Sequence, residues 1–145
     1  MPENLPQNDR DDGWVERVLP TELQAIRESE GDILRRLDEL CYDEDQRFAV
    51  RLAFEEALLN AMKHGNKMNP DLSVSLAYRV TDEAVEIHIT DQGRGFNPNG
   101  VPDPTADENL QRPCGRGVML MYSYMDEVTY AEGGKQVRMV KYRKR

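Results

Sequence analysis

Glu56, Asn60 and Asp91 are the side chains whose types and spacing are best suited to chemistry. An amide oxygen at Asn60 can ligate Mg²⁺, while a carboxylate one helical turn away at Glu56 can orient or deprotonate a nucleophile. A carboxylate at Asp91 needs hydrogen-bond donors, such as an adenine amino group, if it ends the buried face of a strand. The alternatives are a broad polar stripe for the first two residues and a turn Asp that accepts backbone N–H groups for the third.

Two glycine signatures bracket a long loop. Gly93 and Gly95 open it, and Gly115 and Gly117 close it just before an apolar run that begins at Val118 and has the density of a packed helix. Glycines at a helix N-terminus let backbone N–H groups approach an anion, and the helix dipole favours phosphate there. A tight turn into a core helix is the alternative. The chain has no Gly-x-x-x-x-Gly-Lys-Ser/Thr pattern, which disfavours a P-loop enzyme.

A helix predicted over residues 45–64 must position Glu56 and Asn60. Its apolar residues cover most of the circumference, so we expect it to be largely buried. Gly65 is expected to end this helix as its C′ residue, and Lys63 suits the last turn electrostatically.

A strand predicted over residues 84–91 must position Asp91, because alternation with period two puts this carboxylate in phase with the apolar residues. A further helix is predicted over residues 21–40, with Thr21 as its N-cap. The other predicted strands cover residues 14–19, 72–80, 127–130 and 136–142.

Composition is consistent with one domain. The net charge of −8 argues against direct nucleic-acid binding, which requires a basic face. No apolar run approaches the roughly 20 residues that span a bilayer, and the N-terminus is not signal-like, so we expect a cytoplasmic protein without membrane contact. Cys41 and Cys114 show no metal spacing, and no zinc site is expected. Residues 1–13 are predicted to be a disordered tail before a single domain over residues 14–145, with a lid loop at 96–114.

The motifs in their order resemble the ATP-binding domain shared by gyrase-type ATPases, heat-shock chaperones and histidine kinases. Within that superfamily the chain looks most like bacterial anti-sigma-factor serine kinases of the partner-switching type, over roughly residues 14–143. The resemblance rests on Glu56-x-x-x-Asn60-Ala61-x-Lys63-His64-Gly65, Asp91-x-Gly93-x-Gly95-Phe96 and Gly115-x-Gly117. It implies an α+β two-layer sandwich, in which three helices cover one face of a mixed and mainly antiparallel sheet.

The resemblance also implies a site for ATP and Mg²⁺. Asn60 matches the Mg²⁺ ligand, Glu56 the residue that activates the attacking hydroxyl, and Asp91 the adenine contact. The remaining residues of the implied site are Lys63 near the phosphates, Gly93 and Gly95 around the base, and Gly115, Gly117 and Val118 at the phosphates. One departure is Gly134-Lys135-Gln136, where the family usually has Gly-Thr before the last strand. A water or Gln136 is the candidate substitute for the missing hydroxyl.

The function implied by the resemblance is that of an ATP-dependent serine/threonine protein kinase that doubles as an anti-sigma factor. Such a protein binds a sigma factor, phosphorylates a small antagonist protein on serine, and forms a homodimer. The alternative is a non-catalytic interaction module of the same fold that sequesters its partner with weak or no nucleotide binding. The departure at Lys135 keeps this alternative open.

Overall fold

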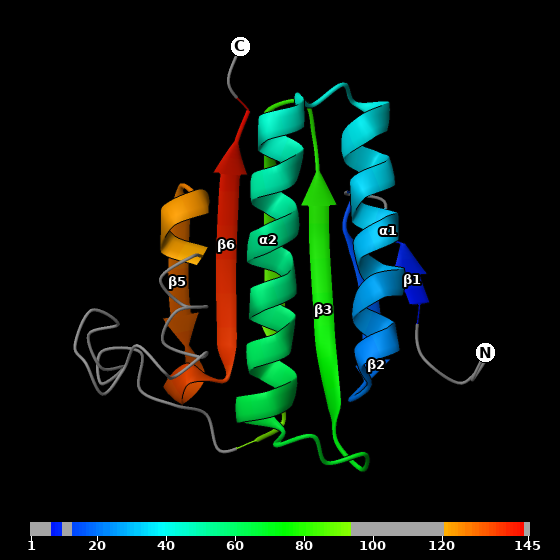
Figure 1. The fold of residues 1–145 in the computed structure, drawn as a ribbon, viewed down its shortest axis with the longest axis vertical. Coiled ribbons are helices and arrows are strands. Elements are labelled where there is room, and N and C mark those ends of the chain that lie inside the picture. The colour runs from blue at the N-terminus through cyan, green and yellow to red at the C-terminus, as the bar shows by residue number, and fades with distance from the viewer. Residues whose placement is uncertain (1–6, 10–12, 94–120, 144–145) are drawn as a thin grey trace.

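A computed structural model of the chain describes residues 7–9, 13–93 and 121–143. It confirms an α+β fold of two layers, with helices on one face of a six-stranded sheet (Figure 1). The sheet order is β1-β2-β3-β4-β6-β5, and every described pairing is antiparallel. The elements are β1 Gln7–Asp9, β2 Val15–Pro20, α1 Leu23–Glu39, α2 Glu44–Asn60, η1 Ala61–Gly65, β3 Ser73–Val80, β4 Ala84–Thr90, β5 Glu127–Ala131, η4 Glu132–Gly134 and β6 Gln136–Tyr142.

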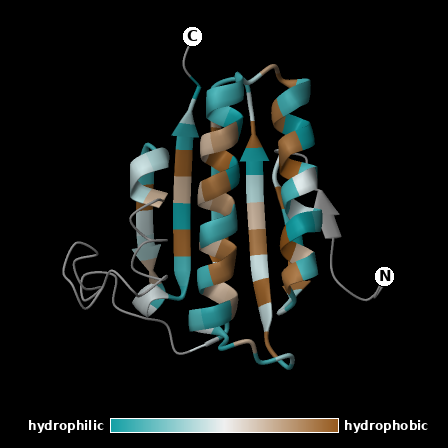
Figure 2. Ribbon diagram, in the orientation of Figure 1, coloured by the Kyte–Doolittle hydropathy of each residue, from teal (hydrophilic) through white to brown (hydrophobic). Residues whose placement is uncertain are grey.

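The core lies between the helices and the sheet. Alternate residues of β3 and β4 face the helices and are buried, as period-two alternation predicts. Helical residues 121–124 form the third helical segment on this face, where Met121 is fully buried (Figure 1). Figure 2 shows the apolar bands along the helices and strands that meet in this layer. The most deeply buried members include Ile33, Leu37, Val50, Phe54, Leu58, Met62, Val74, Ile87 and Met139.

Near the N-terminus the structure differs from the sequence prediction in two places, the tail and the start of the first helix. Residues 7–9, within the predicted disordered tail, form β1 and pair with β2 from Gln7 opposite Arg17 to Asp9 opposite Val15. Polar residues can form this strand because the backbone groups that complete the ladder are common to all sequences. The lid loop predicted at residues 96–114 lies outside the described residues.

Thr21 is not the N-cap of α1. The cap position is taken by Glu22, whose side chain makes no capping bond. The Thr21 hydroxyl instead donates a hydrogen bond of 2.6 Å to the Leu72 carbonyl, 51 residues away. The Thr21 hydroxyl therefore bonds a distant carbonyl instead of accepting from a local helix N–H, and α1 begins at Leu23 rather than at the residue after Pro20.

The long helix predicted over 45–64 is present with a change of geometry near its end. The Asp43 side chain caps α2 by accepting a hydrogen bond of 2.7 Å from Gln46 N. After Asn60 the chain continues as one π-helical turn, η1, to Gly65. Such turns insert extra residues per turn and are frequent at functional sites. In the described part of the chain, no helix combines the length and the apolar character that crossing a bilayer requires.

Candidate functional site

The candidate site lies where α2 and η1 meet the end of β4 and the turn between β5 and β6. Asn60, from the helix, and Asp91, from the end of the strand, border the same small pocket. Both side chains are buried, with 8% and 5% of their surface exposed. The remaining lining residues among those described are Ala57, Ala61, Ile89, Tyr130, Gly134, Lys135 and Val137. The two residues singled out for Mg²⁺ and adenine, 31 positions apart in the chain, are therefore neighbours in space.

Asp91 lies at the buried end of β4. Its N–H donates a hydrogen bond of 3.0 Å to the Lys135 carbonyl, and its Oδ1 accepts one of 2.9 Å from Gly93 N. Burial raises the pKa of this carboxyl, while the Gly93 hydrogen bond and the charge of Lys135 act in the opposite direction. A desolvated carboxylate with few donors around it is a strong acceptor for an N–H group of a ligand.

Gly65 and Gly93 pack directly against the Asp91 turn. A Cβ on Gly65 would overlap Oδ2 of Asp91 and lie 2.7 Å from its Oδ1. A Cβ on Gly93 would overlap the Gly65 carbonyl. Gly65 is the last residue of η1, with Asn66 as the C-cap, and its φ is not positive, so the predicted C′ role is wrong. The glycine is needed because the backbone approaches the carboxylate closely.

Asn60 carries an unsatisfied polar atom. Its Nδ2 is buried and has no hydrogen-bond partner among the described residues. More than nine in ten buried polar groups in folded proteins are hydrogen-bonded, so an orphan amide that borders a pocket fits a group whose partner is a ligand. An Asn amide also provides the neutral oxygen that Mg²⁺ accepts. The Asn60 amide oxygen would hold Mg²⁺, and its Nδ2 would donate to an oxygen of the bound nucleotide.

Glu56 and Lys63 continue the row of Asn60 along α2 and η1. Glu56 is half-buried, and its pKa is raised by burial first and by Glu55 second, while Lys63 lowers it. Lys63 is exposed, yet its charge lowers the pKa of Glu56. The pKa of His64 is lowered by burial and by the neighbouring lysines. A carboxyl with a raised pKa and an adjacent ammonium group can serve proton transfer beside bound phosphate.

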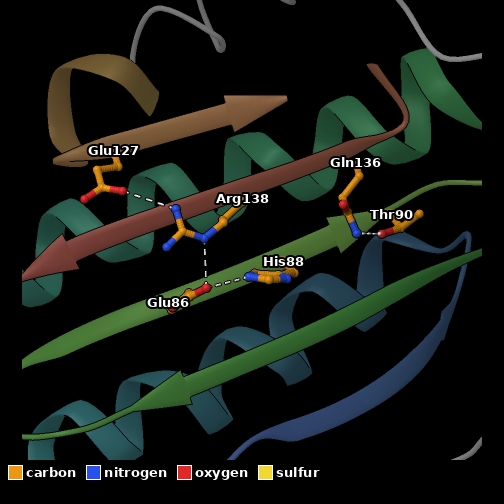
Figure 3. Close-up of polar contacts among 6 residues, drawn as sticks. All are labelled: Glu86, His88, Thr90, Glu127, Gln136 and Arg138. Carbon is orange, nitrogen blue, oxygen red and sulfur yellow. Dashed lines mark hydrogen bonds and ion pairs between the residues drawn. The ribbon is translucent and has the colours of Figure 1, made fainter. Parts of the chain in front are cut away.

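Gln136 is not a substitute for the missing hydroxyl residue. Its Nε2 donates a hydrogen bond of 3.1 Å to Thr90 Oγ1, on the sheet face away from the helices (Figure 3). The next residue, Val137, points into the core, so strand alternation directs Gln136 away from Asp91. Lys135 instead borders the pocket and contributes its carbonyl to Asp91 N.

Four predicted site residues cannot be located: Gly95, Gly115, Gly117 and Val118 lie outside the described residues. Conversely, sequence reasoning missed Asn66, which is 1% exposed and lies directly after Gly65. An Asn after a helix is ordinarily interpreted as a cap or turn residue, so the sequence holds no signal of its burial.

Comparison with known proteins identifies the family. Residues 18–141 match the histidine kinase-like ATPase domain. A protein of Staphylococcus epidermidis named serine-protein kinase RsbW is 37% identical over an alignment of 103 residues, with 66% of this chain and 65% of that protein covered. A protein of the same name from Staphylococcus aureus (strain JH9) is 33% identical over 104 residues, with the same coverage. The chain thus matches slightly less than two thirds of the length of these relatives. Because the family match covers most of the chain, the protein belongs to the histidine kinase-like ATPase domain family.

Proposed function

We propose that the protein is an ATP-dependent serine/threonine protein kinase that also acts as an anti-sigma factor. In this role it binds a sigma factor and, with ATP and Mg²⁺, phosphorylates a small antagonist protein on serine. The observation that carries the proposal is the pairing of Asn60 and Asp91, two buried polar side chains that border one pocket. The family match and the names of the staphylococcal relatives support the same activity.

The base end of the proposed ATP site is the Asp91 turn. The Asp91 carboxylate accepts a hydrogen bond from the adenine amino group, and Gly65 and Gly93 allow the backbone to pack closely around that carboxylate. Gly95 is assigned to the same end. The phosphate end is assigned to Lys63 together with Gly115, Gly117 and Val118, whose N–H groups would contact the phosphates. The domain over residues 14–145 and its loop at 96–114 remain part of the proposal.

At the reacting end, Asn60 would hold Mg²⁺, which neutralises charge on the phosphates when bound. Glu56 accepts the proton of the attacking serine hydroxyl as that oxygen attacks the terminal phosphorus and ADP leaves. A raised pKa brings this base closer to neutral pH, where proton acceptance is most effective. Lys63 acts in the opposite direction and lowers the pKa of Glu56. Positioning and electrostatics are the main requirements of phosphoryl transfer, and these residues provide both.

The partners and assembly belong to the same proposal: a sigma factor, an antagonist protein and a second copy of the chain, all in the cytoplasm, where transcription is controlled. We assign the subunit contact to the sheet face away from the helices, because it carries a network of paired charges. Glu86 lies 2.7 Å from His88 and 2.9 Å from Arg138, which reaches Glu127 at 3.2 Å (Figure 3). Light scattering at micromolar concentration should give twice the chain mass of 16.7 kDa, and a mass of one chain would refute the homodimer.

A phosphate-transfer assay tests the kinase. Purified protein is incubated with Mg²⁺, ATP labelled at the γ-position and an antagonist protein, and labelled serine is identified by mass spectrometry. Wild type should transfer phosphate, whereas Asn60→Ala should not. A matched control is Asn69→Ala, because Asn69 is exposed and lies in the loop after η1. Transfer at the wild-type rate by Asn60→Ala would remove Asn60 from the site.

A non-catalytic interaction module remains a second candidate because Lys135 borders the pocket, at the position where the family resemblance implies a small hydroxyl residue. An ammonium group near Asp91 can compete with the adenine amino group for the carboxylate. This candidate predicts tight binding of the partner protein with or without ATP and no labelled serine. Nucleotide-dependent transfer would exclude it.

A further inference from the structure

The turn that carries Asp91 is fixed by the side chain of Asn66. Asn66 is 1% exposed, and its Oδ1 accepts a hydrogen bond of 2.9 Å from the N–H of Gln92. Its Nδ2 donates to the Ser73 carbonyl at 3.0 Å and to Thr21 Oγ1 at 3.1 Å. One buried amide therefore connects the start of α1, the start of β3 and the residue after Asp91.

Asn66 is itself held in place from the helix side. Its backbone N–H donates to the Ala61 carbonyl at 2.8 Å, the last bond of the π-helical turn. The next residues, Lys67 and Met68, have positive φ values of 52° and 56°, which non-glycine residues rarely adopt. Met68 N donates to the Met62 carbonyl at 2.7 Å and holds this conformation. The loop is thus shaped to present the Asn66 side chain to the sheet.

The Asp91 turn has two further supports. The Gln92 side chain accepts a hydrogen bond of 2.7 Å from Ser73 N, and Gly93 N donates to Asp91 Oδ1 at 2.9 Å. Gly65, the last residue of η1, packs against the Asp91 carboxylate. The Asn66 side chain bonds the backbone of the turn directly, at Gln92 N. Asn66 is not among the described residues that line the pocket, so its effect on a ligand there must pass through the turn.

We propose that Asn66 is a positioning residue for the nucleotide base: by anchoring Gln92 N–H it sets the direction of the Asp91 carboxylate. The proposal deepens the proposed function and rests on it, because it requires ATP to bind at Asp91. Glu56 and Asn60, at the other end of the site, are not held by Asn66. Loss of Asn66 therefore weakens ATP binding and leaves the rate of phosphate transfer at saturating ATP nearly unchanged.

The test uses the full chain and isothermal titration with Mg²⁺-ATP, at a temperature where circular dichroism shows every variant to be folded. Asn66→Ala removes the acceptor for Gln92 N–H. Thr21→Val is the stability-matched control, because it loses the bond to the Leu72 carbonyl and one Asn66 bond but leaves the Asn66 bond to Gln92. Asn69→Ala is the residue-matched control, because it loses one exposed bond to Asp71 in the same loop.

We expect Asn66→Ala to raise the Kd for Mg²⁺-ATP by about tenfold, with KM raised to match and kcat within about twofold of wild type. Thr21→Val and Asn69→Ala should keep Kd within about twofold. A Kd for Asn66→Ala equal to that of wild type overturns the proposal. So does an equal loss in Thr21→Val, because affinity would then follow stability alone.

Asn66→Asp provides a second test if Asn66→Ala does not fold. The carboxylate that this variant introduces still accepts a hydrogen bond from Gln92 N–H, but the bonds that Asn66 donates to Ser73 and Thr21 are lost. Asn66→Asp should therefore bind Mg²⁺-ATP more tightly than any Asn66 variant that has no acceptor for Gln92 N–H. If Asn66→Asp folds and binds Mg²⁺-ATP more than about tenfold more weakly than Thr21→Val does, the result counts against the proposal. Wild type that shows no heat of binding overturns the proposed ATP site itself, which separates the two failures.

Discussion

Gly65→Ala should separate stability from nucleotide binding. Gly65 ends the π-helical turn without a positive φ, so alanine is compatible with the backbone there. In a helix, alanine is favoured over glycine by about 1 kcal/mol. The new Cβ would, however, overlap Oδ2 of Asp91 and lie 2.7 Å from Oδ1, so the carboxylate must move. The expected result is a protein that folds, with a displaced adenine acceptor.

The magnitude follows from one misplaced charged hydrogen bond. Such a bond contributes about 1.5–3 kcal/mol, so the Kd for Mg²⁺-ATP should rise roughly tenfold to a hundredfold. At ATP about 100 times the wild-type Kd, the ligand stabilises wild type by about 2.7 kcal/mol and the variant by about 0.4–1.4 kcal/mol. For a domain of this size, the thermal shift falls from about 5–10 °C to about 1–5 °C. Overpacking costs about 1–3 kcal/mol and offsets the gain in helix propensity.

The assay is thermal unfolding with and without Mg²⁺-ATP, with Gly31→Ala as the matched control. Gly31 is an exposed glycine inside α1, and a Cβ there meets nothing within 4 Å. Gly31→Ala should raise the Tm without ligand and keep the full ATP shift. If Gly65→Ala also keeps the full shift, the carboxylate does not contact the nucleotide and the reasoning about the base pocket is refuted.

Three further predictions concern buried polar groups. Asn60→Leu should raise the stability of the nucleotide-free protein by about 1 kcal/mol, because it removes a buried Nδ2 that has no hydrogen-bond partner among the described residues. The same variant should lose the rise in Tm that Mg²⁺-ATP produces. A lower Tm without nucleotide would contradict this reasoning. Glu56→Gln should lower kcat by about a hundredfold or more and remove the rise of kcat with pH that deprotonation of Glu56 produces; a pH profile that keeps this rise would exclude Glu56 as the base. Burial, and next the neighbouring Glu55, raise the pKa of Glu30 to about 7, although Arg51 lowers this pKa. Between the unfolded pKa and about 7, the folded protein therefore holds a proton that the unfolded protein has lost, so stability against urea should fall as the pH rises through this range. Glu30→Gln should flatten this fall, and an unchanged slope would contradict the reasoning.

The sequence predicted most of the helices and strands, and the burial of Asp91, for physical reasons. Alternation placed Asp91 on the buried face of β4, and the structure leaves it 5% exposed. Helical spacing put Asn60 one turn after Glu56 in a helix that was expected to be largely buried, and the structure buries Asn60. Both inferences depend only on the direction of side chains along a regular element, which the sequence encodes through its apolar pattern.

Contacts between elements could not be predicted in the same way. The close packing of Gly65 against Asp91 and the hydrogen bond between Asn66 and Gln92 join residues that are far apart in the sequence. Thr21 was assigned a local capping role, yet its hydroxyl bonds Leu72. Gln136 looked like a substitute for a hydroxyl residue, but the strand phase turns it toward Thr90. In each case a tertiary partner, invisible to local pattern, decided the role.

The most direct test of the central claim is isothermal titration of Mg²⁺-ATP into wild type and Asp91→Asn. The account predicts one ATP bound per chain by wild type. It predicts a loss of at least about tenfold in affinity for Asp91→Asn, because an amide is a weaker acceptor than a carboxylate for the adenine amino group. Equal affinities for the two proteins, or no binding by folded wild type, would contradict the claim that the pocket between Asn60 and Asp91 is an ATP site.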